Sequence, residues 1–170
     1  MSTLEEFRKA KDDFFAHDSN SPLKPEQRTN FKGLSYFPEN PALRLEVEVN
    51  KFPEQETMQL PTSTGDVQTY TRYGRFKFSV EGQQAKLTIF HNKHGYFLLF
   101  VDALANVETY GSGRYLEPEQ LANGKFLVDF NLAYNPYCAY NEMWSCPIPP
   151  AENRLTAAIR AGQMDAHYMH

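Results

Sequence analysis

The sequence predicts a mainly β protein, an antiparallel barrel or curled β-sandwich with an N-terminal α-helical segment packed against it. Residues 1–33 carry helical signals, whereas the runs that follow residue 43 alternate apolar and polar side chains. Tight-turn sequences separate these runs. Closely spaced strands joined by tight turns are typical of antiparallel sheets that close on themselves or fold over.

Length and composition predict one domain, residues 1–170, with a helical segment at 1–33 and a β-rich core at 43–162. The chain has 170 residues, of which 41% are hydrophobic and 14% aromatic, which is enough to bury a core. The net charge of -4 and the pI near 5.7 give no basic surface for nucleic acid. Because lysine and arginine are scattered, no membrane partner is expected either.

A cytoplasmic location is expected. No apolar run approaches the roughly 20 residues of a membrane helix. The first residues include acids where a secretory signal has a basic start and an apolar block.

An amphipathic helix is predicted from Thr3 to near His17, where the turn sequence at 18–22 ends it. Its inner stripe recurs at steps of three and four residues and is broken once, by a lysine: Leu4, Phe7, Lys11 and Phe14. Pro25 suits the start of a second, short helix that Gly33 closes.

The β-rich part begins with an alternating strand at 43–50 and a long connection at 51–66. Further strands are predicted at 67–73, 75–80, 85–91 and 96–101. The sequences that separate them, predicted as hairpin turns, are Tyr73-Gly74, Glu81-Gly82-Gln83 and His91 to Gly95.

The second half predicts a short strand at 114–115, at most one helical turn at Pro118, and a strand at 125–131. Residues 155–160 alternate like a final strand, although their alanines also suit a short helix.

The segment from Asp129 to Arg154 holds both cysteines, the only tryptophan and four prolines. It has too many turn formers for a long helix or strand, and too many aromatic residues for a linker. Such a composition is typical of an ordered loop that builds a surface or a pocket.

One string within this region, DFNLAYNPYCAYNEMWSCPIPPAENRLTAAIRAG at 129–162, is highly specific. The others are PEQRTNFKGLSYFPENP at 25–41, YGRFKFSVEGQQAKLTIF at 73–90 and ETYGSGRYLEP at 108–118. Together they resemble a family of bacterial and archaeal proteins grouped as DUF1684, over residues 7 to 162. The chain departs from typical members at Ala103 and Thr156, where threonine and proline are usual. The resemblance implies a compact β-rich domain and no particular activity.

Three arginines in these strings, Arg75, Arg114 and Arg154, are candidates for an anion site, because a guanidinium binds carboxylate or phosphate through two parallel hydrogen bonds. The alternative is that each pairs with an internal acid such as Asp102 or Glu152.

Tyrosines and asparagines can stack a flat ligand and fix its orientation, or simply plug the rim of a barrel. The candidates are Tyr73, Tyr115, Asn131, Tyr134 and Asn135. With the arginines, they favour a module that binds a small anionic or polar molecule in a pocket walled by the 129–154 loop.

A hydrolase or lyase is the first alternative, with Asp129 and Glu152, or His91, as proton carriers. A protein-interaction domain is the second. Its anchor patch would be Tyr137, Tyr140 and Trp144, since tyrosine and tryptophan are frequent in interface hot spots.

Cys138 and Cys146 are too far apart in sequence for a usual zinc pair, so no metal or cofactor is expected. Two buried thiols are the leading interpretation. A disulfide would require the chain to double back between them. The oligomeric state is not predicted.

Overall fold

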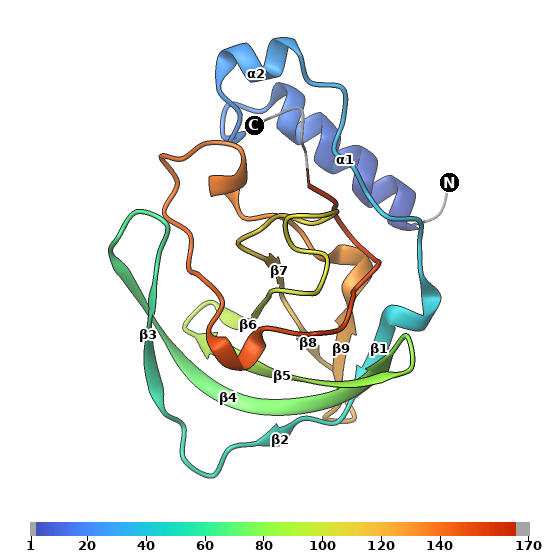
Figure 1. The fold of residues 1–170 in the computed structure, drawn as a ribbon, viewed down its shortest axis with the longest axis vertical. Coiled ribbons are helices and arrows are strands. Elements are labelled where there is room, and N and C mark those ends of the chain that lie inside the picture. The colour runs from blue at the N-terminus through green and yellow to red at the C-terminus, as the bar shows by residue number, and fades with distance from the viewer. Residues whose placement is uncertain (1–2, 166–170) are drawn as a thin grey trace.

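The computed structural model describes residues 3–165, a mainly β protein with antiparallel sheets and N-terminal helices (Figure 1). The predicted mainly β class with an N-terminal helical segment is therefore confirmed, whereas the strand pairing among residues 3–165 closes no barrel, and the curled sandwich stays a prediction. The strands are β1 (Arg44–Val47), β2 (Asn50–Lys51), β3 (Thr57–Pro61), β4 (Val67–Val80), β5 (Gln83–Asn92), β6 (Gly95–Phe100), β7 (Arg114–Leu116), β8 (Glu119–Gln120) and β9 (Phe126–Asp129).

The strands form two sheets. The larger runs β2-β4-β5-β6-β7, with β3 also paired to β4, and the smaller runs β1-β9-β8. In Figure 1, β4 and β5 curve across the lower part of the molecule, with β2 below them. Both sheets contribute to one core, in which Phe76, Leu87, Leu98, Phe126 and Val128 are almost fully buried. Burial of these side chains is the main stabilising contribution to the β part.

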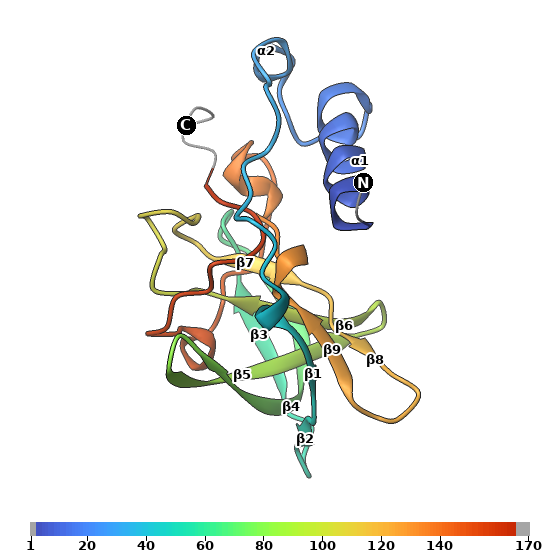
Figure 2. The same ribbon diagram turned by 90° about the vertical axis from the view of Figure 1, so that its right-hand side faces the viewer.

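The helices α1 (Thr3–His17) and α2 (Pro25–Thr29) lie together at one end of the molecule (Figure 2). Both were predicted. Phe15 attaches α1 to the body: it is 1% exposed and contacts Phe31, Tyr137 and Tyr140. Among residues 3–165, no helix has the length and apolar character that crossing a bilayer requires.

The predicted turn at Tyr73-Gly74 is wrong, because β4 continues through it with only a register shift between Arg72 and Gly74. A Cβ at Gly74 would lie 2.7 Å from the Asn50 carbonyl oxygen. The glycine therefore permits the close approach of a neighbouring strand rather than a reversal of the chain.

Two segments predicted to be a connection and a helical turn form short strands instead. The supposed connection at 51–66 contains β3, and β8 lies where a helical turn was predicted after Pro118. The strand predicted at 125–131 ends at Asp129, after which the 3-10 turn η2 (Phe130–Leu132) follows.

The final strand predicted at 155–160 does not form either. Carbonyl groups of Ile159 and of the residues that follow it bind a side chain instead of a neighbouring strand. The guanidinium of Arg114 donates to the carbonyl oxygens of Ile159, Ala161 and Gln163, so this segment wraps a buried cation instead of extending a sheet.

Candidate functional site

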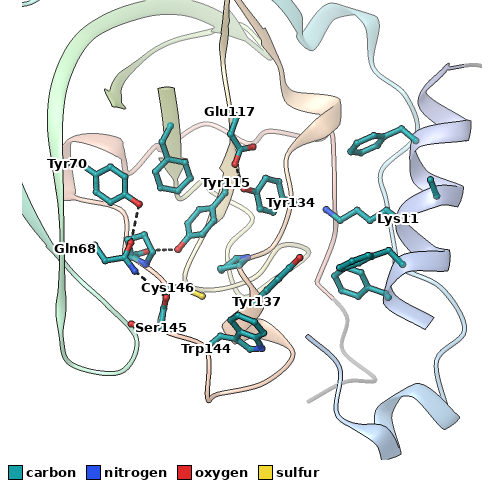
Figure 3. Close-up of a pocket in the computed structure, with 17 residues that line it drawn as sticks. Lys11, Gln68, Tyr70, Tyr115, Glu117, Tyr134, Tyr137, Trp144, Ser145 and Cys146 are labelled. Carbon is teal, nitrogen blue, oxygen red and sulfur yellow. Dashed lines mark hydrogen bonds between the residues drawn. The ribbon is translucent and has the colours of Figure 1, made fainter. Parts of the chain in front are cut away.

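A pocket of about 730 Å³ lies between α1 and the β part of the chain (Figure 3). We call it the aromatic pocket, because more than half of its lining residues carry aromatic rings. These are Phe7, Phe14, Phe15, Tyr70, Phe97, Tyr115, Tyr134, Tyr137 and Trp144. The polar members are Lys11, Gln68, Glu117 and Ser145.

Three parts of the chain form its walls. α1 contributes Phe7, Lys11 and Phe14, and the strands β4, β6 and β7 contribute rings from the opposite side. The third wall is residues 134–147, the middle of the aromatic loop that the sequence indicated. Hydrogen bonds from Ser145 to Asp66 and Thr62 hold the end of this loop against the turn between β3 and β4.

Lys11 is the cation of the aromatic pocket. Its Nζ lies 4.5 Å from the centre of the Tyr134 ring. Burial lowers the pKa of Lys11 to about 8, although the charges of Glu117 and Asp12 act in the opposite direction. The carboxylate of Asp12 is itself engaged, since it accepts a hydrogen bond from the Leu34 amide at 3.0 Å. Lys11 is therefore charged at neutral pH but poorly solvated.

Three tyrosines of the pocket are neutral hydrogen-bond donors. Tyr134 donates to Glu117 Oε1, and Tyr115 donates to the Pro147 carbonyl oxygen. Burial raises the pKa of both hydroxyl groups well above the ordinary value. Tyr70 donates to Gln68 at 3.1 Å. These bonds fix the orientation of the rings before any ligand arrives.

The sequence placed Tyr115 and Tyr134 among the ligand-binding candidates, and both line the pocket. Two members of the expected interaction patch, Tyr137 and Trp144, line it as well, in edge contact with ring centres 5.1 Å apart. The third, Tyr140, is 4% exposed and cannot anchor a partner. Trp144 keeps 41% of its surface exposed at the rim.

The expectation that three arginines converge on one ligand is wrong. Arg114 is 1% exposed and binds three carbonyl oxygens, with Asp102 at 3.5 Å. Arg154 is exposed, and neither it nor Arg75 lines the aromatic pocket. The alternative given by the sequence, pairing with an internal acid, describes Arg114 and Arg75.

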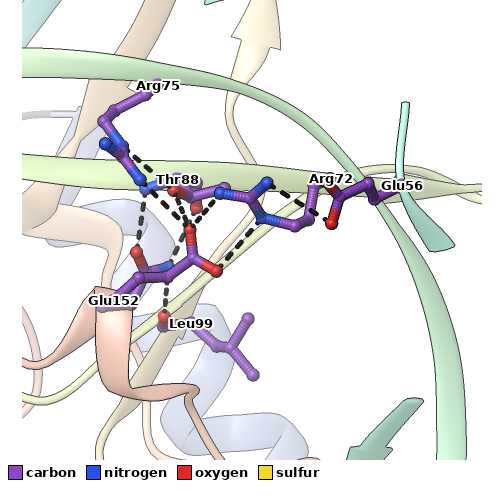
Figure 4. Close-up of polar contacts among 7 residues, drawn as sticks. Glu56, Arg72, Arg75, Thr88, Leu99 and Glu152 are labelled. Atoms are coloured by element: carbon purple, nitrogen blue, oxygen red, sulfur yellow. Dashed lines mark hydrogen bonds and ion pairs between the residues drawn. The ribbon is translucent and has the colours of Figure 1, made fainter. Parts of the chain in front are cut away.

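Glu152 is the centre of a separate polar cluster on β4 and β5 (Figure 4). Its carboxylate accepts bonds from Arg72 Nε at 3.1 Å and Nη2 at 2.7 Å, and from Thr88 Oγ1 at 2.6 Å. Arg75 lies 3.5 Å away. The neighbouring Asn153 is fully buried and bonds to the backbone of β5 and β6. This cluster fastens the 3-10 turn η4 (Ala151–Asn153) to the sheet.

Burial raises the pKa of Glu152, but the hydrogen bonds from Arg72 and Thr88 and the two arginine charges outweigh it, so the pKa lies below its ordinary value. A carboxylate with a lowered pKa stabilises the fold above its ordinary pKa, and that contribution is lost as the pH falls through the folded value. We expect Glu152→Gln to cost about 1–2 kcal/mol near pH 7, since water partly screens the cluster.

Urea denaturation as a function of pH measures this effect. The difference between wild type and Glu152→Gln should shrink toward acid pH. Glu142→Gln, a change at an exposed glutamate, is the control. A constant difference down to strongly acid pH would assign the loss to packing instead of charge.

The remaining candidates have structural partners. Asp129 caps η2 through the Asn131 amide at 3.0 Å and pairs with Arg44 at 3.7 Å. Asn131 bonds to the backbone of Asn40 in both directions. Asp129 and Glu152 thus belong to separate clusters, and neither lines the aromatic pocket.

Asn135, Tyr73 and His91 also lie outside the pocket lining. Asn135 is buried and donates to the Tyr140 hydroxyl group at 3.1 Å. Tyr73 packs in edge contact against Tyr96, and His91 lies 3.3 Å from Gln55. Within residues 3–165, no three His, Cys, Asp or Glu side chains are placed to hold a metal ion.

Sequence reasoning missed Lys11, although a signal was present. A lysine at an inward position of an otherwise apolar helical stripe indicates a cation that faces an enclosed space or a paired acid. Gln68, Tyr70, Phe97 and Glu117 were missed because no local pattern relates them to the loop.

Comparison with known proteins agrees with the fold and leaves the activity open. The family described as "Protein of unknown function (DUF1684)" matches residues 29–164. The solution structure of an uncharacterised protein from Haloarcula marismortui is similar, with 37% identity and a TM-score of 0.71. That similarity covers 95% of this chain and 91% of the other. Among proteins with curated descriptions, none matches.

Proposed function

Since the chain belongs to the DUF1684 family, whose description assigns no activity, we propose from the geometry of the aromatic pocket that the protein binds a small, flat, largely apolar molecule with one anionic group. The observation that carries this proposal is Lys11, a partly desolvated cation among aromatic rings. An anion that reaches it replaces the water lost on burial.

The size and chemistry of the pocket support a small molecule. A volume of about 730 Å³ lies within the range of roughly 300–1,000 Å³ that is usual for such sites. Aromatic walls stack planar ligands, and a few fixed polar groups set their orientation. Tyr115 and Tyr134 are already held by their own hydrogen bonds, so little side-chain entropy is lost on binding.

The charges favour an anion over a cation. Glu117 is exposed, and its Oε1 accepts a hydrogen bond from the Tyr134 hydroxyl group. Lys11 and Glu117 interact through their charges alone, without a hydrogen bond between them. A ligand amine at this place would meet the positive charge of Lys11, which the charges of Glu117 and Asp12 stabilise less than burial disfavours it. The sequence predicted an anionic ligand bound by three arginines. We keep the anionic ligand and propose that Lys11 binds it instead of the arginines.

Catalysis receives less support from the same geometry. A hydrolase or lyase needs an acid or base facing the substrate. The proton carriers that the sequence indicated, Asp129, Glu152 and His91, all lie outside the pocket lining, and within it Glu117 is engaged with the Tyr134 hydroxyl group. We therefore place binding ahead of catalysis.

The test uses two probes of equal shape, 2-naphthoate and 2-naphthamide, with affinities measured by calorimetry. We expect wild type to prefer the carboxylate by about tenfold or more near pH 7, because a charge-assisted hydrogen bond contributes about 1.5–3 kcal/mol. Lys11→Met keeps the aliphatic stem and removes the charge, so this variant should bind both probes equally.

The pH dependence gives a second readout. The preference for naphthoate should decline as the pH rises through about 8, where free Lys11 loses its proton, while the affinity for naphthamide stays constant. The groups facing Lys11 are Glu117, Asp12 and Tyr134. Lys9→Met, at an exposed position of the same helix, is the matched control. If Lys11→Met kept the naphthoate preference, or if wild type bound neither probe, the proposal would fail.

A further inference from the structure

The two cysteines meet beside the aromatic pocket, although seven residues separate them in the chain. The Cys138 amide donates to Cys146 Sγ at 3.3 Å, so the Cys146 sulfur lies against the backbone of Cys138. Both are free thiols. Cys146 is buried against the pocket wall, where Figure 3 shows its sulfur, and Cys138 is partly exposed.

The fold holds the two ends of this loop in separate places. At the first end, Tyr137 and Tyr140 pack against Phe15 of α1. At the other end, the Cys146 amide donates to Ser63 Oγ at 3.1 Å, in the turn between β3 and β4. Contacts on both sides of the loop therefore bring Cys146 Sγ against the backbone of Cys138.

The surroundings make the two thiols unequal. Hydrogen bonds from Cys146, Tyr110 and Ser63 outweigh burial and lower the pKa of Cys138 to about 6. The contact with Cys138 and burial raise the pKa of Cys146. Thiol–disulfide exchange uses this arrangement, in which one thiolate reaches solvent and a protonated thiol lies behind it.

We propose that Cys138 and Cys146 form a redox-active dithiol that low-molecular-weight disulfides of the glutathione type oxidise to an intramolecular disulfide. The Cys138 thiolate attacks one sulfur of the small disulfide, whose S–S bond breaks and releases a thiolate. Cys146 then gives up its proton to solvent, and its sulfur attacks Cys138 Sγ and expels the second small thiolate. The protein loses two electrons and its thiol protons, and the small disulfide becomes two thiols.

The product ties together the two ends of one pocket wall, residues 134–147. Tyr137 precedes Cys138, and Trp144 lies two residues before Cys146, so the new bond fixes the distance between these rings. This site does not depend on the ligand proposal, since its chemistry is measured on the thiols alone.

The experiment treats fully reduced protein with glutathione disulfide near pH 7, without oxygen or metals. Samples are quenched with acid, alkylated and weighed as intact chains. The expected product is a monomer about 2 Da lighter than the reduced chain, resistant to alkylation and carrying no glutathione. A wild-type protein that keeps two reactive thiols, gathers two glutathiones or links into dimers would overturn the proposal.

Two variants separate the roles of the thiols. Cys146→Ser should stop at one glutathione bound to Cys138, and Cys138→Ser should react at least about tenfold more slowly. Equal rates for the two variants would contradict the assignment.

If either variant fails to fold, alkylation of the wild-type protein between pH 5 and 8 still tests which cysteine is the more reactive. Cys138 should be modified first, with a rate that rises through about pH 6. The groups facing Cys138 are Cys146, Tyr110 and Tyr115. The tyrosines stay protonated in this range, because burial raises the pKa of both, that of Tyr110 to about 12. Modification of Cys146 first would overturn the proposal.

Discussion

Replacing Arg114 by alanine should lower the free energy of unfolding by about 3–5 kcal/mol, the usual cost of breaking a buried ion pair from one side. The side chain is 1% exposed, and its loss leaves the carboxylate of Asp102 buried with a partner missing. It also deprives the carbonyl oxygens of Ile159, Ala161 and Gln163 of their donor. Unsatisfied buried acceptors add to the loss.

Urea denaturation followed by circular dichroism measures this effect. Arg154→Ala is the matched control, because that side chain is exposed and should change the free energy of unfolding by less than about 0.5 kcal/mol. Equal effects at the two arginines would mean that the segment after residue 154 does not depend on a central guanidinium.

Phe15→Ala should detach α1 from the body and so remove one wall of the aromatic pocket. The truncation leaves a cavity among Phe31, Tyr137 and Tyr140 and costs about 3–5 kcal/mol. A free helix of 15 residues is marginal in water, so its loss of docking is also a loss of structure. We expect faster amide hydrogen exchange throughout α1 and at least about tenfold weaker binding of 2-naphthoate.

The sheets should remain intact in this variant, because their core lies in a separate cluster. Lys9→Ala, on the exposed side of the same helix, is the control. A Phe15→Ala protein with normal exchange in α1 and unchanged binding of naphthoate would show that the helix is held by other contacts.

Local sequence patterns correctly predicted those helices and strands that are determined by interactions between residues close together in the chain. The periodicity and turn chemistry that defined α1 depend on residues within one or two turns, and so do the hairpin strands β4 to β6. The Tyr73-Gly74 pair misled because a glycine required for close strand approach has the same sequence appearance as one in a turn.

The composition of the candidate site depends on contacts between residues far apart in the chain, and no local sequence pattern indicates those contacts. Arg75 and Arg114 both follow glycines in sequence, yet one lies on the outer cluster around Glu152 and the other inside the core. The loop at 129–154 was correctly expected to be ordered, and Tyr115 and Tyr134 were chosen from it and its neighbourhood. Lys11, which lies over the Tyr134 ring, is more than a hundred residues away from both tyrosines, so only the folded chain relates them.

The most direct test of the central claim is a map of amide chemical-shift changes when 2-naphthoate is added to the protein. The account predicts changes concentrated at Lys11, Tyr115, Tyr134 and Trp144, including the indole N–H of this single tryptophan. The Lys11→Met variant should lose them at the same probe concentration. Changes centred on Glu152 or Asp129 instead, with the aromatic pocket unaffected, would contradict it.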